Sequence, residues 1–144
     1  MKYLSILVVS IVLFSCSGKT PSKKETVIAK KVANKIEVID FYSTHRCVTC
    51  KAIEANTKYT LDTYFSSELK NGKITFQTIN VDKEENYKIA EEYEATGTAL
   101  FLNVIVNGKE KHIDLTDFAF IKGMEKEVFS TELKSKLDTE LKNI

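Results

Sequence analysis

The chain has 144 residues, of which 21 are basic and 20 acidic, so its net charge at neutral pH is close to zero. This balance gives no basis for electrostatic binding of nucleic acid. We find no internal repeat and no low-complexity tract, and the length suits one domain with its own core.

The first sixteen residues form a secretory segment rather than part of the fold. Lys2 precedes an apolar run, Tyr3–Phe14, which has the length of a signal-peptide core and is too short to cross a bilayer as a mature helix. A secretory segment that ends at a cysteine after a small residue, here Ser15-Cys16, resembles a bacterial lipobox. The resemblance implies a signal peptide over residues 1–15 and lipidation of Cys16. A plain secretory peptide or an uncleaved anchor, with no role for Cys16, is the alternative.

Residues 16–34 then lead from the lipid to the folded domain, which we place at residues 35–144. The stretch from Ser17 to about Lys24 is small, polar and basic and contains Pro21, the only proline, which predicts a flexible tether. Glu25–Lys35 has a weak helical pattern and predicts a short helix. The mature chain has equal numbers of basic and acidic residues, so any membrane association comes from lipid rather than from a basic patch.

The folded domain is predicted to begin with a strand. Lys35–Tyr42 is rich in β-branched and aromatic residues, which is typical of a buried strand. From Val48 to about Leu69 the apolar residues fall on one broad helical face, and Asn71-Gly72 ends that helix. Lys73–Val81 alternates and then becomes apolar, which predicts a second strand.

The second half of the domain predicts a helix, a hairpin and a closing helix. Asp82 is expected to cap the first of these helices, and Asn107-Gly108 is a strong hairpin signal. The predicted segments are a helix from Lys83 to about Tyr93, strands at Ala99–Val106 and Lys111–Leu115, and an amphipathic helix from about Met124 to Lys142. Phe118-Ala119-Phe120 is expected to close the end of the sheet or to contact a partner. Two β-α-β units, a hairpin and a helix require an α/β fold with a mixed four-stranded sheet flanked by helices.

Cys47-Val48-Thr49-Cys50 lies between the first strand and the first helix. Two cysteines at this spacing form a disulfide across one turn, hold a metal, or bind a thiophilic oxyanion. If Cys16 carries lipid, Cys47 and Cys50 are the only remaining pair in an oxidising compartment. A disulfide that closes so short a loop stabilises little, so we expect this pair to serve chemistry rather than stability. A C-x-x-C between a strand and a helix is typical of a thioredoxin-like redox site.

Four features in chain order resemble the thioredoxin-like superfamily over roughly residues 35–143. They are Ile39-Asp40-Phe41-Tyr42, Cys47-Val48-Thr49-Cys50-Lys51, Asn80-Val81-Asp82 and Asn107-Gly108-Lys109. The resemblance implies a three-layer thioredoxin-like fold and thiol–disulfide exchange. His45–Glu54 further resembles small thioredoxin-like envelope proteins of the Bacteroidetes, of the nitroreductase-subunit or ArsF-like family.

One departure from that superfamily concerns the backbone before the third strand. Thr98-Ala99 stands where the family has a cis-proline facing the two cysteines. A cis bond without proline costs about 2.5–4 kcal/mol, so we expect a trans bond here. The backbone edge that usually pairs with a substrate is then altered.

The expected roles of the site residues follow from their place at the start of a helix. Cys47 meets unpaired amides and the positive end of the helix dipole, which lower a thiol pKa, so it is the predicted nucleophile. Cys50, one turn in and more buried, is the predicted resolving thiol. His45 and Arg46 are expected to tune the thiolate with positive charge. The resemblance implies that Asp40, if buried, transfers protons for Cys50; a merely solvated carboxylate is the alternative.

The first functional expectation is a monomeric, envelope-anchored thiol–disulfide oxidoreductase with no cofactor beyond the Cys47–Cys50 disulfide. Its partners would be protein thiols and disulfides or a membrane reductase, with the domain facing the periplasm or the exterior. The alternative is a dithiol metal or metalloid binding protein, since His45, Cys47 and Cys50 offer one nitrogen and two sulfurs to zinc or copper, and trivalent arsenic favours vicinal thiols. A redox subunit of a larger complex is a third possibility.

Overall fold

The computed structural model describes residues 33–144. The expected signal peptide, the lipidated Cys16, the tether and the helix expected before the first strand lie outside this range. Within it, no helix is both long enough and apolar enough to cross a membrane.

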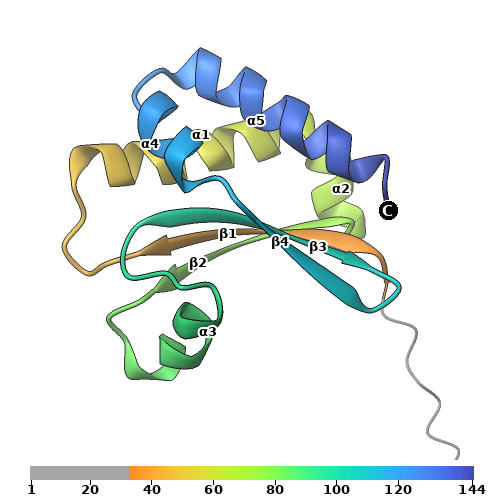
Figure 1. Ribbon diagram of the computed structural model, residues 1–144. Helices are drawn as coiled ribbons and strands as arrows, with labels where there is room; N and C mark the ends of the chain where they lie inside the picture. Colours follow the sequence, from red (N-terminus) through yellow and green to blue (C-terminus); the bar gives the residue numbers. More distant parts are fainter. Residues whose placement is uncertain (1–32) are drawn as a thin grey trace, which may run out of the picture.

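A four-stranded sheet forms the middle layer, with the strand order β2-β1-β3-β4 (Figure 1). The strands are β1 (Lys35–Tyr42), β2 (Ile74–Asn80), β3 (Ala99–Val106) and β4 (Lys109–Asp114). β1 runs parallel to β2 and antiparallel to β3, and β3 runs antiparallel to β4. The expected mixed sheet is confirmed.

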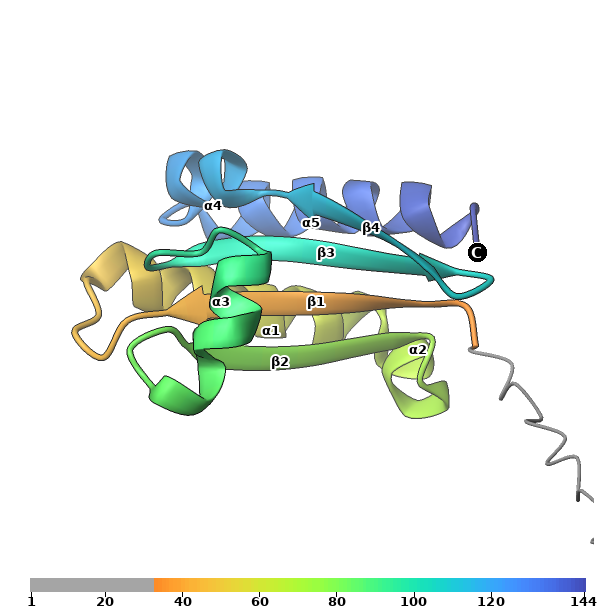
Figure 2. The ribbon, with the colours of Figure 1, turned by 60° about the horizontal axis from the view of Figure 1, so that its bottom comes forward.

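Helices cover the two faces of this sheet unequally. One face carries four helices, whereas the other carries a short 3₁₀ turn and one short helix across one end (Figures 1 and 2). The first group is α1 (Val48–Tyr64), α2 (Ser66–Asn71), α4 (Thr116–Lys122) and α5 (Lys126–Leu141); the second is η1 (Glu84–Asn86) and α3 (Tyr87–Glu92). This three-layer arrangement confirms the thioredoxin-like fold class.

Strand alternation in β1 decides which side chains face which layer. Ile36 and Val38 are fully buried in the core that includes residues of α1 and α5, whereas Ile39 and Phe41 are buried with residues of α3. Because side chains of a strand alternate between faces, Asp40 follows Ile36 and Val38 onto the face covered by α1. The Asp40 carboxyl is therefore directed toward α1, the helix whose first turn carries the two cysteines.

The connection between β2 and β3 is not the second parallel β-α-β unit that the sequence predicts. α3 has six residues and is about 9 Å long, whereas the eight residues of β3 span about 26 Å. The chain does not return to the far end of the sheet before β3, which pairs antiparallel with β1. β3 therefore starts at the end where β2 stops and runs in the opposite direction.

The helix predicted from Val48 to Leu69 is interrupted at Phe65. This residue leaves helical geometry, with φ −128° and ψ 25°, and its side chain is buried in the main core. α2 begins at the next residue, and Gly72 ends it in the left-handed conformation at φ 77°. Burial of the Phe65 side chain thus interrupts a helix that the sequence pattern predicts as continuous.

The expected cap at Asp82 is wrong. The segment predicted as a helix from Lys83 begins with η1, and no side chain caps it. Asp82 instead accepts a hydrogen bond from the Thr44 backbone N–H at 2.6 Å. The carboxylate thus fixes the loop before α1 against the end of β2.

The hairpin and the closing helix match the prediction closely. Asn107 and Gly108 both adopt positive φ, 53° and 76°, as a two-residue type I′ turn requires. β4 begins two residues before its predicted start, and α5 lies within the predicted closing helix. The segment around Phe118-Ala119-Phe120 forms an additional helix, α4, in which Ala119 is buried in the core.

Candidate functional site

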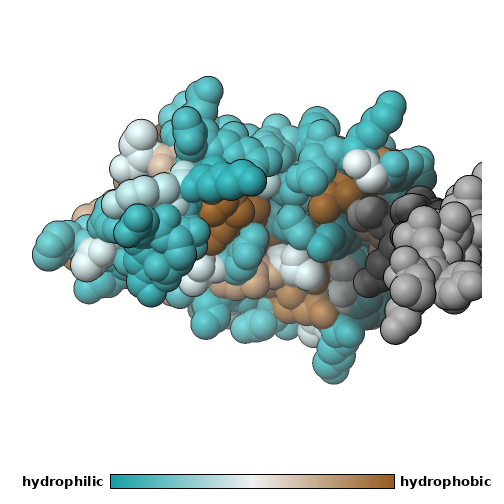
Figure 3. Space-filling model, turned by 90° about the horizontal axis from the view of Figure 1, so that it is seen from below, coloured by the Kyte–Doolittle hydropathy of each residue, from teal (hydrophilic) through white to brown (hydrophobic). Residues whose placement is uncertain are grey.

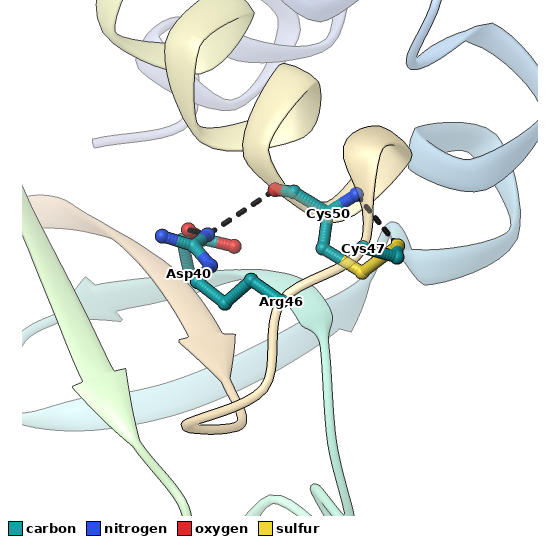
Figure 4. The surroundings of a disulfide bond; sticks show 4 residues. All are labelled: Asp40, Arg46, Cys47 and Cys50. Atoms are coloured by element: carbon teal, nitrogen blue, oxygen red, sulfur yellow. Dashed lines mark hydrogen bonds and ion pairs between the residues drawn. A yellow bond between two sulfur atoms is a disulfide. The ribbon is translucent and has the colours of Figure 1, made fainter.

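The centre of the candidate site is a disulfide between Cys47 and Cys50, at the start of α1 (Figure 4). Their Cα atoms are 5.1 Å apart. Cys47 is the N-cap residue, and its Sγ accepts a hydrogen bond from the Cys50 backbone N–H at 3.0 Å. The first turn of α1 contains no acidic residue, so its free amides and the helix dipole favour negative charge on Cys47.

The two sulfurs differ in access. Cys47 is exposed, whereas Cys50 is 8% exposed. A partner thiol or disulfide therefore meets Cys47 first. This is the arrangement that the predicted roles of nucleophile and resolving thiol require.

Asp40 lies on the face of β1 that α1 covers and is fully buried. Its burial raises the pKa of the carboxyl to about 7, although the nearby Arg46 guanidinium acts in the opposite direction. One carboxyl oxygen, Oδ2, lies 3.4 Å from Arg46 Nη2, and the other has no hydrogen-bond partner among the described residues. The alternative of a solvated strand-end carboxylate is wrong, because alternation along β1 places this residue inside.

The Arg46 side chain is directed away from Cys47, so its charge does not lie next to the Cys47 sulfur. Its guanidinium lies beside Asp40 and donates to the Cys50 carbonyl oxygen at 3.1 Å (Figure 4). It forms ion pairs with Asp40 and with Glu54. The same group sits 4.6 Å from the centre of the Tyr42 ring. It therefore acts on the buried side of the disulfide.

Glu54 is a site residue that sequence reasoning missed. It lies on α1 one turn after Cys50, and its carboxylate pairs with Arg46 Nη1. The i, i+4 spacing from Cys50 was the available signal, because it places both residues on one face of the helix. Nothing in the sequence directs the Arg46 side chain to that face.

His45 does not approach the sulfurs through any hydrogen bond or ion pair in the described residues. It is exposed and lies near Asp82, whose pKa is lowered mainly by the hydrogen bond from the Thr44 backbone N–H. His45, Cys47 and Cys50 do not form a group of converging metal ligands in this disulfide state. Within residues 33–144, one such group exists, at Glu92, Glu110 and His112, and all three are exposed.

The loop that replaces the cis-proline leads into β3. No peptide bond in the described part of the chain is cis, so Thr98-Ala99 is trans as expected. This loop and α3 line a cavity of about 490 Å³ with His112 of β4. The face that carries α3 is largely hydrophilic, with apolar side chains in small separate patches (Figure 3).

Solved structures of thioredoxins are similar to this chain. Mitochondrial thioredoxin 3 of Saccharomyces cerevisiae, in its oxidised form, is 28% identical over 62% of this chain and 76% of its own, with a TM-score of 0.41. Fasciola hepatica thioredoxin is 20% identical over 61% of this chain and 76% of its own, with a TM-score of 0.39. No family model matches the chain, and no curated protein matches it.

The site combines a thioredoxin-like sheet order with a C-x-x-C disulfide at a helix start. Thiol–disulfide exchange requires an accessible sulfur and a second thiol that resolves the mixed disulfide. The arrangement supports a thiol–disulfide oxidoreductase.

Proposed function

We propose that this chain is an envelope-anchored thiol–disulfide oxidoreductase that uses Cys47 and Cys50 on protein thiols and disulfides or on a membrane reductase. The observation that carries the proposal is the unequal exposure of the two joined sulfurs at the N-terminus of α1. A pair kept only for stability has no need of an exposed sulfur at a position that stabilises a thiolate.

The reductive reaction proceeds in two exchanges. The Cys47 thiolate attacks a substrate disulfide, forms a mixed disulfide and releases one substrate thiolate. Cys50 then loses its proton and attacks Cys47 Sγ, which breaks the mixed disulfide and releases the second substrate thiolate. The substrate gains two electrons, and the protein ends with the Cys47–Cys50 disulfide that the structure holds. The opposite direction oxidises a substrate dithiol by the same steps.

Asp40 is the group that we assign to proton transfer with Cys50. It is buried on the α1 face of β1, and a carboxyl with a pKa near 7 accepts and releases a proton at physiological pH. An ordinary exposed aspartate is a much weaker base.

The envelope anchor is proposed from the first sixteen residues. The apolar segment ending at Cys16 supplies the lipidation signal. The lipid then holds the domain at the membrane, facing the periplasm or the exterior.

The function is tested with insulin-type disulfide reduction by the purified chain. We expect the wild type to turn over and Cys47→Ser to fall to the rate of the reductant alone. Cys50→Ser should accumulate a mixed disulfide between Cys47 and the substrate, because the resolving thiol is missing. Undiminished activity of Cys47→Ser would refute the proposal.

A further inference from the structure

Arg46 contacts three groups of the site, two of which, Asp40 and Cys50, are drawn in Figure 4. Its two terminal nitrogens contact the Asp40 carboxylate on β1, the Glu54 carboxylate on α1 and the Cys50 carbonyl oxygen. These three groups come from the strand, the helix and the resolving cysteine. One guanidinium therefore links the proton-transfer carboxyl to the residue that it serves.

The two carboxylates compete for this one cation in different surroundings. The Asp40 side chain is completely buried, the Arg46 side chain is 15% exposed, and the Glu54 side chain is 27% exposed. When both acids are ionised, the trio of Asp40, Arg46 and Glu54 carries one net negative charge. Most of the surface of these three side chains is shielded from water. Interactions between charges are stronger in such surroundings than at the surface.

Among the described residues, two charged groups act most strongly on the ionisation of Asp40. These groups are Arg46 and Glu54. The flanking strands place Thr78 and Leu100 opposite Asp40, and neither side chain titrates. The ionisation of Asp40 thus depends on two residues that can be substituted, Arg46 and Glu54.

We infer that Arg46 and Glu54 are positioning residues that set, in opposite directions, how readily Asp40 exchanges a proton with Cys50. Arg46 favours the ionised form of Asp40, which takes the proton. Glu54 shares the guanidinium and adds negative charge, and so it favours the protonated form. The inference rests on the proposed function, because Asp40 matters to the reaction only if Cys50 resolves a mixed disulfide.

The step that the trio controls balances as follows. Ionised Asp40 takes the proton of the Cys50 thiol, and the resulting thiolate attacks Cys47 Sγ. The Cys47–substrate bond breaks, the substrate sulfur leaves with the electron pair, and the protein disulfide forms. Asp40 then returns its proton to water. A base that holds the proton too weakly cannot take it, and one that holds it too strongly cannot release it.

The test measures the ionisation of Asp40 directly in the purified, oxidised full chain. The ¹³C shift of its carboxyl carbon is followed against pH in the wild type, Arg46→Gln, Glu54→Gln and Lys51→Gln. We expect the midpoint to rise by about one unit or more in Arg46→Gln and to fall by roughly half a unit or more in Glu54→Gln. Lys51 is an exposed helix residue next to Cys50, and its variant should titrate like the wild type.

The same variants are then compared in the resolving step, as the pH dependence of substrate release from a preformed mixed disulfide. The midpoints should separate in the same order. If Arg46→Gln fails to fold, Arg46→Lys keeps the charge without the planar fork and should give a smaller upward shift. Midpoints that coincide, or that move in the same direction, would overturn the inference. Because the carboxyl titration needs no turnover, a chain without exchange activity refutes the proposed function separately.

Discussion

Burial of the Asp40 carboxyl lowers the stability of the folded state when this group is ionised. It is fully buried, and one of its oxygens has no hydrogen-bond partner among the described residues. Burial therefore raises its pKa to about 7, well above the value of an exposed aspartate. Such a group is tolerated in a core when its proton affinity is what the site needs.

Stability should consequently fall as the pH rises from about 4 to about 7. The raised pKa means that the folded state binds a proton more tightly than the unfolded chain does in this range. The stabilisation is fully present below the unfolded pKa and is lost as the pH passes the folded pKa. We expect Asp40→Asn to remove this slope and to be more stable than the wild type at pH 8, by roughly 2–4 kcal/mol.

Denaturant unfolding of the oxidised chain at pH 5 and pH 8 measures this effect. Glu91→Gln, on the exposed surface of α3, is the matched control and should keep the wild-type slope. A wild-type chain whose free energy of unfolding does not decline over this interval would show that Asp40 is ionised at little cost.

At the scale of elements, α4 is the helix that closes the structure against the start of α1. Its C-cap residue Gly123 packs so closely that an added Cβ would lie 2.6 Å from the Ala119 carbonyl oxygen and 3.0 Å from Ile53 Cγ1. The Gly123 carbonyl accepts a hydrogen bond from Asn56 Nδ2 at 2.8 Å. The helix that presents the cysteines is thus fixed by backbone contact with the end of α4.

Gly123→Ala should therefore destabilise the chain by about 1–3 kcal/mol, the usual cost of overpacking. Gly97→Ala is the control, since its Cβ would meet only Ser43 Oγ at an ordinary 3.6 Å. Denaturant midpoints of the two variants compare the effects. Equal midpoints would mean that α4 moves away at no cost.

Local signals in the sequence predicted most elements, because each depended on few residues. β-branched and aromatic composition predicted β1, alternation predicted β2, Asn107-Gly108 predicted the hairpin, and the C-x-x-C marked the start of α1. The direction of β3 depended instead on how the chain passes from β2 to β3, and the break at Phe65 depended on a core that is built from distant segments. Glu54 belongs to the site because the long Arg46 side chain reaches it. No local sequence pattern predicts the direction of that side chain.

At the scale of the whole molecule, β1 runs from the end of the domain where the chain enters the sheet to the end that carries the disulfide. The strand begins at Lys35 and ends beside the loop that carries the cysteines (Figure 1). Its eight residues extend over about 26 Å. The described chain thus enters the sheet at the end opposite the disulfide, and the lipid anchor that we propose ahead of residue 35 would leave the disulfide accessible.

Removal of the proposed lipid should leave the chemistry intact. We expect Cys16→Ala to lose the detergent partitioning of the wild type while its Cys47–Cys50 pair keeps the same redox equilibrium, because the proposed lipid takes no part in the exchange steps. Phase partitioning and thiol alkylation measure the two properties. Partitioning that equals the wild type would contradict lipidation at Cys16.

The central claim is that the Cys47–Cys50 disulfide exchanges electrons rather than merely stabilising the fold. Equilibration of the purified chain with glutathione and dithiothreitol redox buffers, followed by alkylation of free thiols, measures this directly. We predict a single two-electron transition between roughly −120 and −270 mV, the range of catalytic dithiols. A pair that stays oxidised in buffers more reducing than about −300 mV would behave as a structural disulfide and would contradict the account.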